Sequence, residues 1–227
     1  MPPQKRNRDR RAEVHARHPE HRPKSHHHTD HRKMHEEVWT RERASAVLES
    51  PDRHRSEDAR NLWSRVGLQP GMTVVDVGAG SGFYTFPASE RVGPTGRVYA
   101  VDVSQELIDL IRERAAERHR SNIEALVSRP DHVPLPGNLA DRVLLANVLH
   151  GVPPATVAEA VRILRPGGRL VDVDWKKEST PGGPPVEHRL AATEARRVLE
   201  GYGLETNAEW DLGPYHYALM LEKKRRA

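Results

Sequence analysis

The sequence contains no cysteine among its 227 residues. This absence excludes disulfide bonds, cysteine-ligated zinc and thiol nucleophiles, and it fits a reducing compartment, so a cytoplasmic location is expected. No run of about 18 apolar residues occurs, and no membrane-spanning helix is therefore expected. The charged N-terminus is not followed by an apolar stretch, which argues against a secretory signal.

Apolar side chains are also nearly absent from residues 1–33. Residues 1–35 carry ten Lys and Arg against four Asp and Glu, whereas the other 192 residues carry 26 against 28. The basic character of the chain therefore belongs to this segment. Because so few apolar groups cannot offset the entropy lost on folding, residues 1–33 are predicted to be a disordered tail. A second, short basic tail is expected at 223–227.

Eight of the fourteen histidines lie in residues 1–35. Neutral imidazoles at short spacing bind borderline divalent ions, so His26, His27, His28 and His31 are candidate ligands. Incidental affinity of a solvated tail explains the same pattern, and no dedicated metal site is predicted. Basic arms also attract nucleic-acid phosphates, but both ends lack aromatic residues for stacking, which argues against specific recognition of a single strand.

From residue 67 to residue 222 the chain alternates apolar runs with amphipathic stretches. Strands are predicted at 73–77, 97–102, 123–127, 142–147, 169–174, 204–211 and 215–222, and helices at 82–91, 105–119, 154–164 and 188–201. The first strands are nearly continuous apolar runs, which is typical of parallel strands covered on both faces. The last two strands are joined by a short turn and must pair as an antiparallel hairpin.

The expected fold is therefore α/β and doubly wound, with a mostly parallel sheet of seven strands. A helical cap is expected to precede it at 34–66, with its second helix at 55–66. The domain proper is expected at 67–222.

A glycine loop follows the first predicted strand. Residues 74–82 read Val-Val-Asp-Val-Gly-Ala-Gly-Ser-Gly, and the second strand ends at Asp102. Glycines allow main-chain N–H groups to approach a ligand closely at the start of a helix. A carboxylate at the end of the second strand can accept two hydrogen bonds from a ribose diol. The pattern predicts a pocket for a ribose-containing cofactor.

Two common cofactor classes fit this loop poorly. The loop does not end in Gly-Lys-Ser or Gly-Lys-Thr, so it is not a P-loop. The dinucleotide fingerprint needs two residues between its second and third glycines, whereas Gly80 and Gly82 are separated by one. The predicted C-terminal hairpin also disfavours a nicotinamide-dependent oxidoreductase.

Four motifs in order resemble the class I S-adenosylmethionine-dependent methyltransferases. Residues 74–82 are similar to the first motif of that family, 98–104 to its acidic motif, 141–150 to its fourth-strand motif and 162–170 to the motif entering its fifth strand. The resemblance covers about residues 60–222 and is nearest to the ubiquinone and menaquinone biosynthesis methyltransferases. It implies S-adenosylmethionine as cofactor and a small molecule as methyl acceptor. Arsenite methyltransferases share these motifs but bind arsenic through thiolates, which this chain lacks.

The resemblance implies a set of cofactor contacts. Asp76 is expected to accept a hydrogen bond from the cofactor ammonium, Asp102 to hold the ribose hydroxyls and Val103 to pack on adenine, while the loop N–H groups face the carboxylate. Related enzymes place an acid after the third strand. Arg129 aligns there, so Asp131 is the nearest substitute, unless both are solvated loop charges. The cofactor set is Asp76, Gly78, Ala79, Gly80, Gly82, Asp102, Val103, Asp131 and Asn147.

Two residues are candidates for the chemistry at the methyl group. His150 follows the fourth strand and is a candidate general base, although a loop histidine bonded to main chain explains it too. Trp175 follows the fifth strand and either walls the acceptor pocket, with a cation–π contact to the sulfonium, or packs at the strand end. Tyr84 is a further candidate lining residue. The loop 179–185 is either a cover or a plain connector.

Two competing interpretations stay open at this point. One is a non-catalytic, methyltransferase-like binding protein whose histidine-rich tail carries metal. The other keeps methyl transfer but takes RNA or protein as the acceptor.

Overall fold

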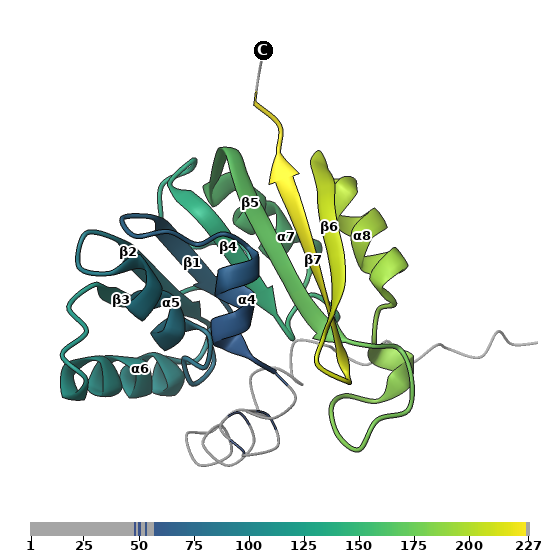
Figure 1. The fold of residues 1–227 in the computed structure, drawn as a ribbon, viewed down its shortest axis with the longest axis horizontal. Helices are drawn as coiled ribbons and strands as arrows, with labels where there is room; N and C mark the ends of the chain where they lie inside the picture. The colour runs from purple at the N-terminus through teal and green to yellow at the C-terminus, as the bar shows by residue number, and fades with distance from the viewer. Residues whose placement is uncertain (1–47, 49, 51–52, 54–56, 226–227) are drawn as a thin grey trace, which may run out of the picture. The chain divides into compact units, whose positions relative to one another are not determined.

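A computed structural model describes Leu48, Ser50, Arg53 and residues 57–225 (Figure 1). The tail predicted at 1–33, with its candidate metal-binding histidines, lies outside the described residues. Most of the cap predicted at 34–66 and residues 226–227 lie outside them as well. Among the residues described, no helix has the length and apolar content needed to cross a membrane.

A single sheet of seven strands organises the described chain (Figure 1). The spatial order is β3-β2-β1-β4-β5-β7-β6, with β7 antiparallel to both of its neighbours. The doubly wound, mostly parallel sheet with a C-terminal hairpin is confirmed. The strands are β1 (Thr73–Val77), β2 (Arg97–Asp102), β3 (Ile123–Val127), β4 (Ala140–Ala146), β5 (Leu164–Trp175), β6 (Leu204–Leu212) and β7 (His216–Lys223).

Two of the helices begin at a residue whose side chain caps them. Asp58 accepts from the N–H of Asn61 at 3.0 Å, and Ser104 accepts from the N–H of Leu107 at 3.4 Å, so each caps the helix that follows it. The helices are α4 (Ala59–Arg65), α5 (Thr85–Val92), α6 (Gln105–Glu117), α7 (Pro154–Ile163) and α8 (Ala192–Glu200), with a short 3₁₀ turn at Val186–His188.

Three predicted helix starts were too early. The helix expected from residue 55 begins at Ala59, where Asp58 is the N-cap. The helix expected from residue 82 begins at Thr85, because Gly82 has a φ of 88° and cannot join a right-handed helix. The helix expected from residue 188 begins at Ala192, because the main chain is extended at Arg189 (φ −83°, ψ 149°) and Ala191 (φ −67°, ψ 151°).

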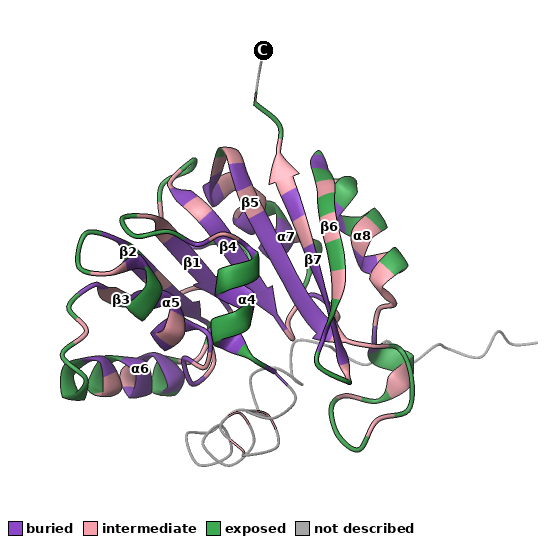
Figure 2. Ribbon diagram, in the orientation of Figure 1, coloured by how far each residue is buried: buried purple, intermediate pink, exposed green. Residues whose placement is uncertain are grey.

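Both faces of the sheet are buried (Figure 2). Neighbouring residues of β1 show this most clearly, since Val74 packs with α4 and α5 while Val75 packs with α7 and α8. Successive strand side chains point to opposite faces, and each face therefore has its own core. The edge strand β6 alternates between buried and exposed positions because one of its faces meets solvent.

The sheet register aligns the ends of several strands at one edge. The carboxyl ends of β1, β2, β4 and β5 lie side by side, as parallel pairing requires. The antiparallel strand β7 begins where β5 ends, and its first residue, His216, pairs with Trp175. Side chains from four parallel strands and from the start of β7 therefore meet at this edge.

Candidate functional site

The glycine loop between β1 and α5 has a left-handed main chain. Gly78, Gly80 and Gly82 have φ angles of 75°, 56° and 88°, which side-chain-bearing residues rarely adopt. A Cβ on Gly78 would lie 2.6 Å from Val148, and one on Gly80 would lie 2.9 Å from Leu48. Both conformation and space therefore demand glycine here.

Four N–H groups of this loop, which were expected to face a ligand, donate to acceptors within the protein. The N–H groups of Gly78 and Ala79 donate to the carbonyl of Val101 at 2.8 and 3.0 Å, and that of Gly82 donates to Ala79. These amides stabilise the loop instead of facing outward. The prediction was wrong for these groups because the return of the chain beside β2 offers them a nearer acceptor.

Asp102 lies at the end of β2, beside the glycine loop. Its two carboxylate oxygens accept from the N–H of Gly80 at 2.9 Å and from the N–H of Ser104 at 3.0 Å. The side chain is 9% exposed, so it is fixed yet reaches the surface of the crevice. Each carboxylate oxygen has a further lone pair that can accept from a hydroxyl group.

Asp76 lies beneath the glycine loop and is almost fully buried. Its carboxylate accepts from the hydroxyl of Thr85 at 2.6 Å. Burial raises the pKa of Asp76 from 3.8 to about 6, against the lowering effects of Thr85 and of the positive charge on Arg53. The group therefore titrates near neutral pH, and its charge state depends on what binds beside it.

The remaining predicted cofactor residues lie in different surroundings. Val103 follows Asp102 and is 41% exposed, which leaves an apolar surface open beside the carboxylate. Asp131 is exposed and pairs with Arg129 at 3.0 Å, and this hydrogen bond lowers the pKa of Asp131. Asn147 ends β4 in a left-handed conformation, with its amide oxygen buried and without a hydrogen-bond partner among the described residues.

A histidine–aspartate pair stands at the ends of β4 and β5. His150 Nδ1 lies 2.8 Å from one carboxylate oxygen of Asp174 and 2.9 Å from the other. The main-chain N–H of His150 donates to the same carboxylate at 3.2 Å. Asp174 is fully buried, whereas the side chain of His150 is 14% exposed. The buried acid therefore orients the ring. In the tautomer with the proton on Nδ1, this nitrogen donates to Asp174 and Nε2 is an acceptor.

Glu57 joins the segment before α4 to the ends of the strands. Its carboxylate accepts from the hydroxyl of Tyr84 at 2.7 Å, from Nε of Arg53 at 3.0 Å and from the amide of Asn147 at 3.3 Å. Nε2 of His216 lies 3.5 Å away. Glu57 is 2% exposed, so this cluster is a buried polar connection between the glycine loop and β7.

His216 in turn contacts Trp175. The two ring centroids are 4.2 Å apart, and His216 is fully buried. Burial lowers the pKa of His216, with the negative charge of Glu57 opposing this effect, so the ring is held neutral. A continuous line of contacts therefore runs from Tyr84 through Glu57 and His216 to Trp175.

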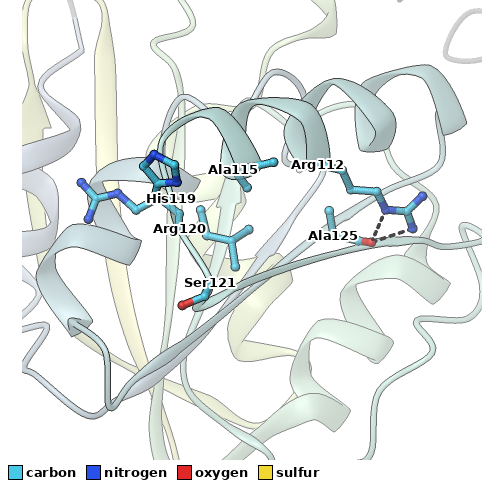
Figure 3. A pocket seen from close by; sticks show the side chains of 8 residues that line it. Arg112, Ala115, His119, Arg120, Ser121 and Ala125 are labelled. Carbon is cyan, nitrogen blue, oxygen red and sulfur yellow. Dashed lines mark hydrogen bonds between the residues drawn. The ribbon is translucent and has the colours of Figure 1, made fainter.

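Two hollows lie elsewhere on the surface. One of about 450 Å³ lies between α6 and β3, where Arg112 donates to the carbonyl of Ala125 (Figure 3). Another of about 410 Å³ lies beside Lys176, Trp210 and Tyr217. Neither is lined by the glycine loop, Asp102 or His150. No cluster of three or more metal-ligating side chains occurs among the residues that the structure describes.

A glycine loop and an acidic strand end at the carboxyl edge of a doubly wound sheet define a Rossmann-like, nucleotide-type cofactor-binding protein. Comparison with known proteins narrows this class. Residues 75–172 match the family described as "Methyltransferase domain". A SAM-dependent methyltransferase structure from Aquifex aeolicus has a TM-score of 0.73 and 34% identity, covering 77% of this chain and 94% of that one. The chain belongs to the class I S-adenosylmethionine-dependent methyltransferases, as its motifs predicted.

Curated relatives point the same way. Arsenite methyltransferase of Halobacterium salinarum is 34% identical over 191 residues, which is 70% of this chain and 48% of that protein. Demethylmenaquinone methyltransferase of Lactococcus lactis is 30% identical over 128 residues, which is 53% of this chain and 51% of that protein. The chain spans about half the length of the curated relatives it matches.

Several residues at this edge escaped the sequence analysis. Glu57 and His216 belong to no recognised motif. Glu57 precedes α4 and His216 begins β7, and neither position indicates a functional residue. A histidine heading an apolar strand, as in His216-Tyr-Ala-Leu, was the one available signal. Asp174 was visible only as one acid in Asp-Val-Asp-Trp, and its pairing with His150 required the β4–β5 register.

Proposed function

We propose that this protein transfers a methyl group from S-adenosylmethionine to a small-molecule acceptor that gives up a proton in the reaction. The observation that carries the proposal is the pair formed by His150 and Asp174, whose side chains meet at 2.8 Å at the ends of β4 and β5. Family membership supports the cofactor. The small-molecule acceptor, like the expected cytoplasmic location, comes from the sequence and stays a prediction.

The residues at the crevice fit the cofactor. Gly78 and Gly80 give the loop its positive φ angles of 75° and 56°, and the space at their Cβ positions is taken by Val148 and Leu48. Asp102 offers fixed carboxylate oxygens suited to a ribose diol, and exposed Val103 offers an apolar surface suited to adenine. Asp76 and the unpartnered amide oxygen of Asn147 offer acceptors suited to an ammonium group. When bound, S-adenosylmethionine supplies an electrophilic methyl group on a positively charged sulfur.

His150 handles the proton. With Nδ1 donating to Asp174, Nε2 accepts the proton of the acceptor nucleophile as that nucleophile bonds to the methyl carbon. The electron pair of the broken carbon–sulfur bond stays on sulfur. Asp174 stabilises the imidazolium that forms, because its carboxylate lies 2.8 Å from Nδ1 of the ring. The proton leaves through Nε2 once the product has gone.

The dyad also restricts the acceptor class. A proton-accepting histidine is needed for a hydroxyl or a carbon acid, and a thiolate-bound metalloid needs none. The relatives named for arsenite and for demethylmenaquinone methylation therefore differ in relevance. Since this chain has no cysteine, we favour an organic acceptor with a dissociable proton. Nothing at the described edge favours a non-catalytic role or an RNA or protein acceptor.

The test is a metabolite screen with label on the cofactor methyl group. The wild-type chain is expected to label a small molecule in a metabolite extract. His150→Gln is expected to lower the rate by about 10²–10³, while S-adenosylhomocysteine still binds with unchanged affinity. The matched control is His119→Asn, an exposed histidine with a φ of 52°, a conformation that asparagine tolerates.

Three outcomes would overturn parts of the proposal. Label found only on RNA or protein would exclude the small-molecule acceptor. A fully active His150→Gln variant would remove the proton-accepting role. Absence of S-adenosylhomocysteine binding by the wild type would contradict the cofactor itself.

A further inference from the structure

One buried arginine organises the loop that follows β5. Arg189 is 3% exposed, and its guanidinium donates to four main-chain carbonyls at 2.8–3.0 Å. The accepting residues are Lys176, Glu178, Gly182 and Pro184. These residues span the whole loop between β5 and the 3₁₀ turn. Arg189 therefore gathers the loop around a single side chain.

This loop is packed against Trp175. The guanidinium carbon of Arg189 lies 5.1 Å from the indole centroid, within the range of a cation–π contact. Gly183 has a φ of 91°, and a Cβ there would lie 2.6 Å from the indole ring. The ring also meets His216 at 4.2 Å. Trp175 is thus enclosed by the loop and by β7, and the cation over its ring is Arg189.

The chemistry of the contacts requires arginine. The planar guanidinium presents five N–H donors in a fixed fork and stacks on aromatic rings, whereas a lysine ammonium is a compact point charge with three donors. Four of the five donors of Arg189 are used on carbonyls in different directions. A lysine at this position could not reproduce both the four hydrogen bonds and the contact with the indole ring.

We propose that Arg189 is a positioning residue for the methyl acceptor: it clamps residues 176–189 onto Trp175 and so makes the indole a fixed wall of the acceptor site. This inference rests on the proposed function. The loop at 179–185 was predicted to be either a cover or a plain connector. Under this proposal it is neither, because it holds Trp175 in place before the acceptor binds. Trp175 connects to the cofactor crevice through His216, Glu57 and Tyr84.

A fixed wall matters because methyl transfer depends on alignment. The protein gains rate mainly by holding the nucleophile and the methyl carbon in line, and a displacement of about 1 Å can cost about 10²-fold. Loosening the loop is therefore expected to impair acceptor use without changing the distant contacts at Gly80 and Asp102.

Two adjacent glycines provide a pair of variants, of which only Gly183 combines a positive φ of 91° with a close approach to the indole ring. Gly183→Ala puts a methyl group against the indole, whereas a Cβ on Gly182 meets nothing within 4 Å. Against a dilution series of the metabolite extract, Gly183→Ala is expected to raise the apparent KM at least about tenfold, with S-adenosylhomocysteine affinity within about twofold of wild type. Gly182→Ala is expected to match wild type. Equal behaviour of the two variants would overturn the proposal.

Hydrogen–deuterium exchange tests the clamp without any ligand. In the full chain, Arg189→Met and Arg189→Lys are expected to speed exchange of the amides at 176–189 about tenfold, and exchange at 76–84 is expected to stay unchanged. The control is Arg196→Met, which removes an arginine of α8 that pairs with Glu209 on the surface. Unchanged exchange at 176–189, or an equal rise at both segments, would contradict a local clamp.

The two proposals fail in distinguishable ways. A wild-type chain that binds no S-adenosylhomocysteine would contradict the methyltransferase function, while the exchange measurement would still judge the clamp. A wild-type chain that methylates normally, with an Arg189→Lys variant of unchanged apparent KM, would contradict the positioning role alone.

Discussion

The two sides of the crevice are built in different ways. The side that we assign to the cofactor consists of the glycine loop and the end of β2, and its parts lie within residues 73–104. The side that we assign to the acceptor combines His150, Asp174, Trp175, Arg189 and His216, which come from segments up to 66 residues apart. The first is shaped by main-chain conformation and the second by side-chain contacts, so the first can keep its cofactor while the second changes its acceptor.

The largest expected effect is that of substituting Asp102, the carboxylate that we assign to the ribose hydroxyls of the cofactor. Two hydrogen bonds to a charged group contribute about 1.5–3 kcal/mol each, so Asp102→Ala is expected to weaken S-adenosylhomocysteine binding about a thousandfold. Calorimetry measures this, with the exposed acid of Asp109→Ala as the control. If Asp102→Ala binds S-adenosylhomocysteine as tightly as wild type, the cofactor does not bind at the end of β2. The distinction between a cofactor side and an acceptor side would then fail.

The next effect concerns the buried charge beneath the loop. Between pH 3.8 and about 6 the folded chain keeps a proton on Asp76 that the unfolded chain has lost, so this group makes stability fall as pH rises. Above about pH 6 the cost reaches about 3 kcal/mol at most. Asp76→Asn is therefore expected to be more stable than wild type near pH 7.5, and the gain is expected to vanish near pH 4.

Urea denaturation at the two pH values measures this difference. The expected result is a pH-dependent gain in the free energy of unfolding for Asp76→Asn, accompanied by weaker cofactor binding. A difference between variant and wild type that is the same at both pH values would show that the pKa of Asp76 is not raised.

A smaller effect distinguishes the two reasons for glycine in the loop, which are its positive φ and the lack of room for a Cβ. Gly78 and Gly203 have similar φ angles, 75° and 81°, but a Cβ would meet Val148 at Gly78 and nothing within 4 Å at Gly203. Both alanine variants carry the backbone cost of about 1–2 kcal/mol, so only the excess loss at Gly78→Ala reports the close approach of Val148. Thermal unfolding measures it, and equal losses would mean that conformation alone demands glycine here.

The smallest expected effect is at the N-terminus. Deleting residues 1–33 is expected to leave S-adenosylhomocysteine affinity within about twofold of wild type, because the side that we assign to the cofactor lies within residues 73–104. Calorimetry of the truncated and full chains decides this. A large loss of affinity in the truncated chain would mean that residues 1–33 contribute to cofactor binding.

The contrast also explains what the sequence could predict. The order of strands and helices followed from apolar periodicity, and the cofactor loop followed from glycines whose spacing reflects left-handed main chain. The hairpin of β6 and β7 followed from a connection too short for a helix. These features depend on residues that are near one another in the sequence.

The acceptor side was hidden because its contacts are not local. Asp174 reaches His150 across 24 residues, and Glu57 reaches Asn147 across 90. Arg189 was predicted within the helix at 188–201, and nothing in the sequence indicated that it bonds four carbonyls of the preceding loop. The expected outward orientation of the loop amides was wrong for a related reason, since the acceptor at Val101 belongs to the next strand.

The position of β7 has a consequence for the order in which the site is completed during synthesis. Ribosomes make chains from the N-terminus, so the glycine loop and Asp102 emerge well before residue 216. His216 can close around Trp175 only after the antiparallel strand has been inserted between β5 and β6. The side that we assign to the acceptor is therefore completed last, when β7 joins the sheet.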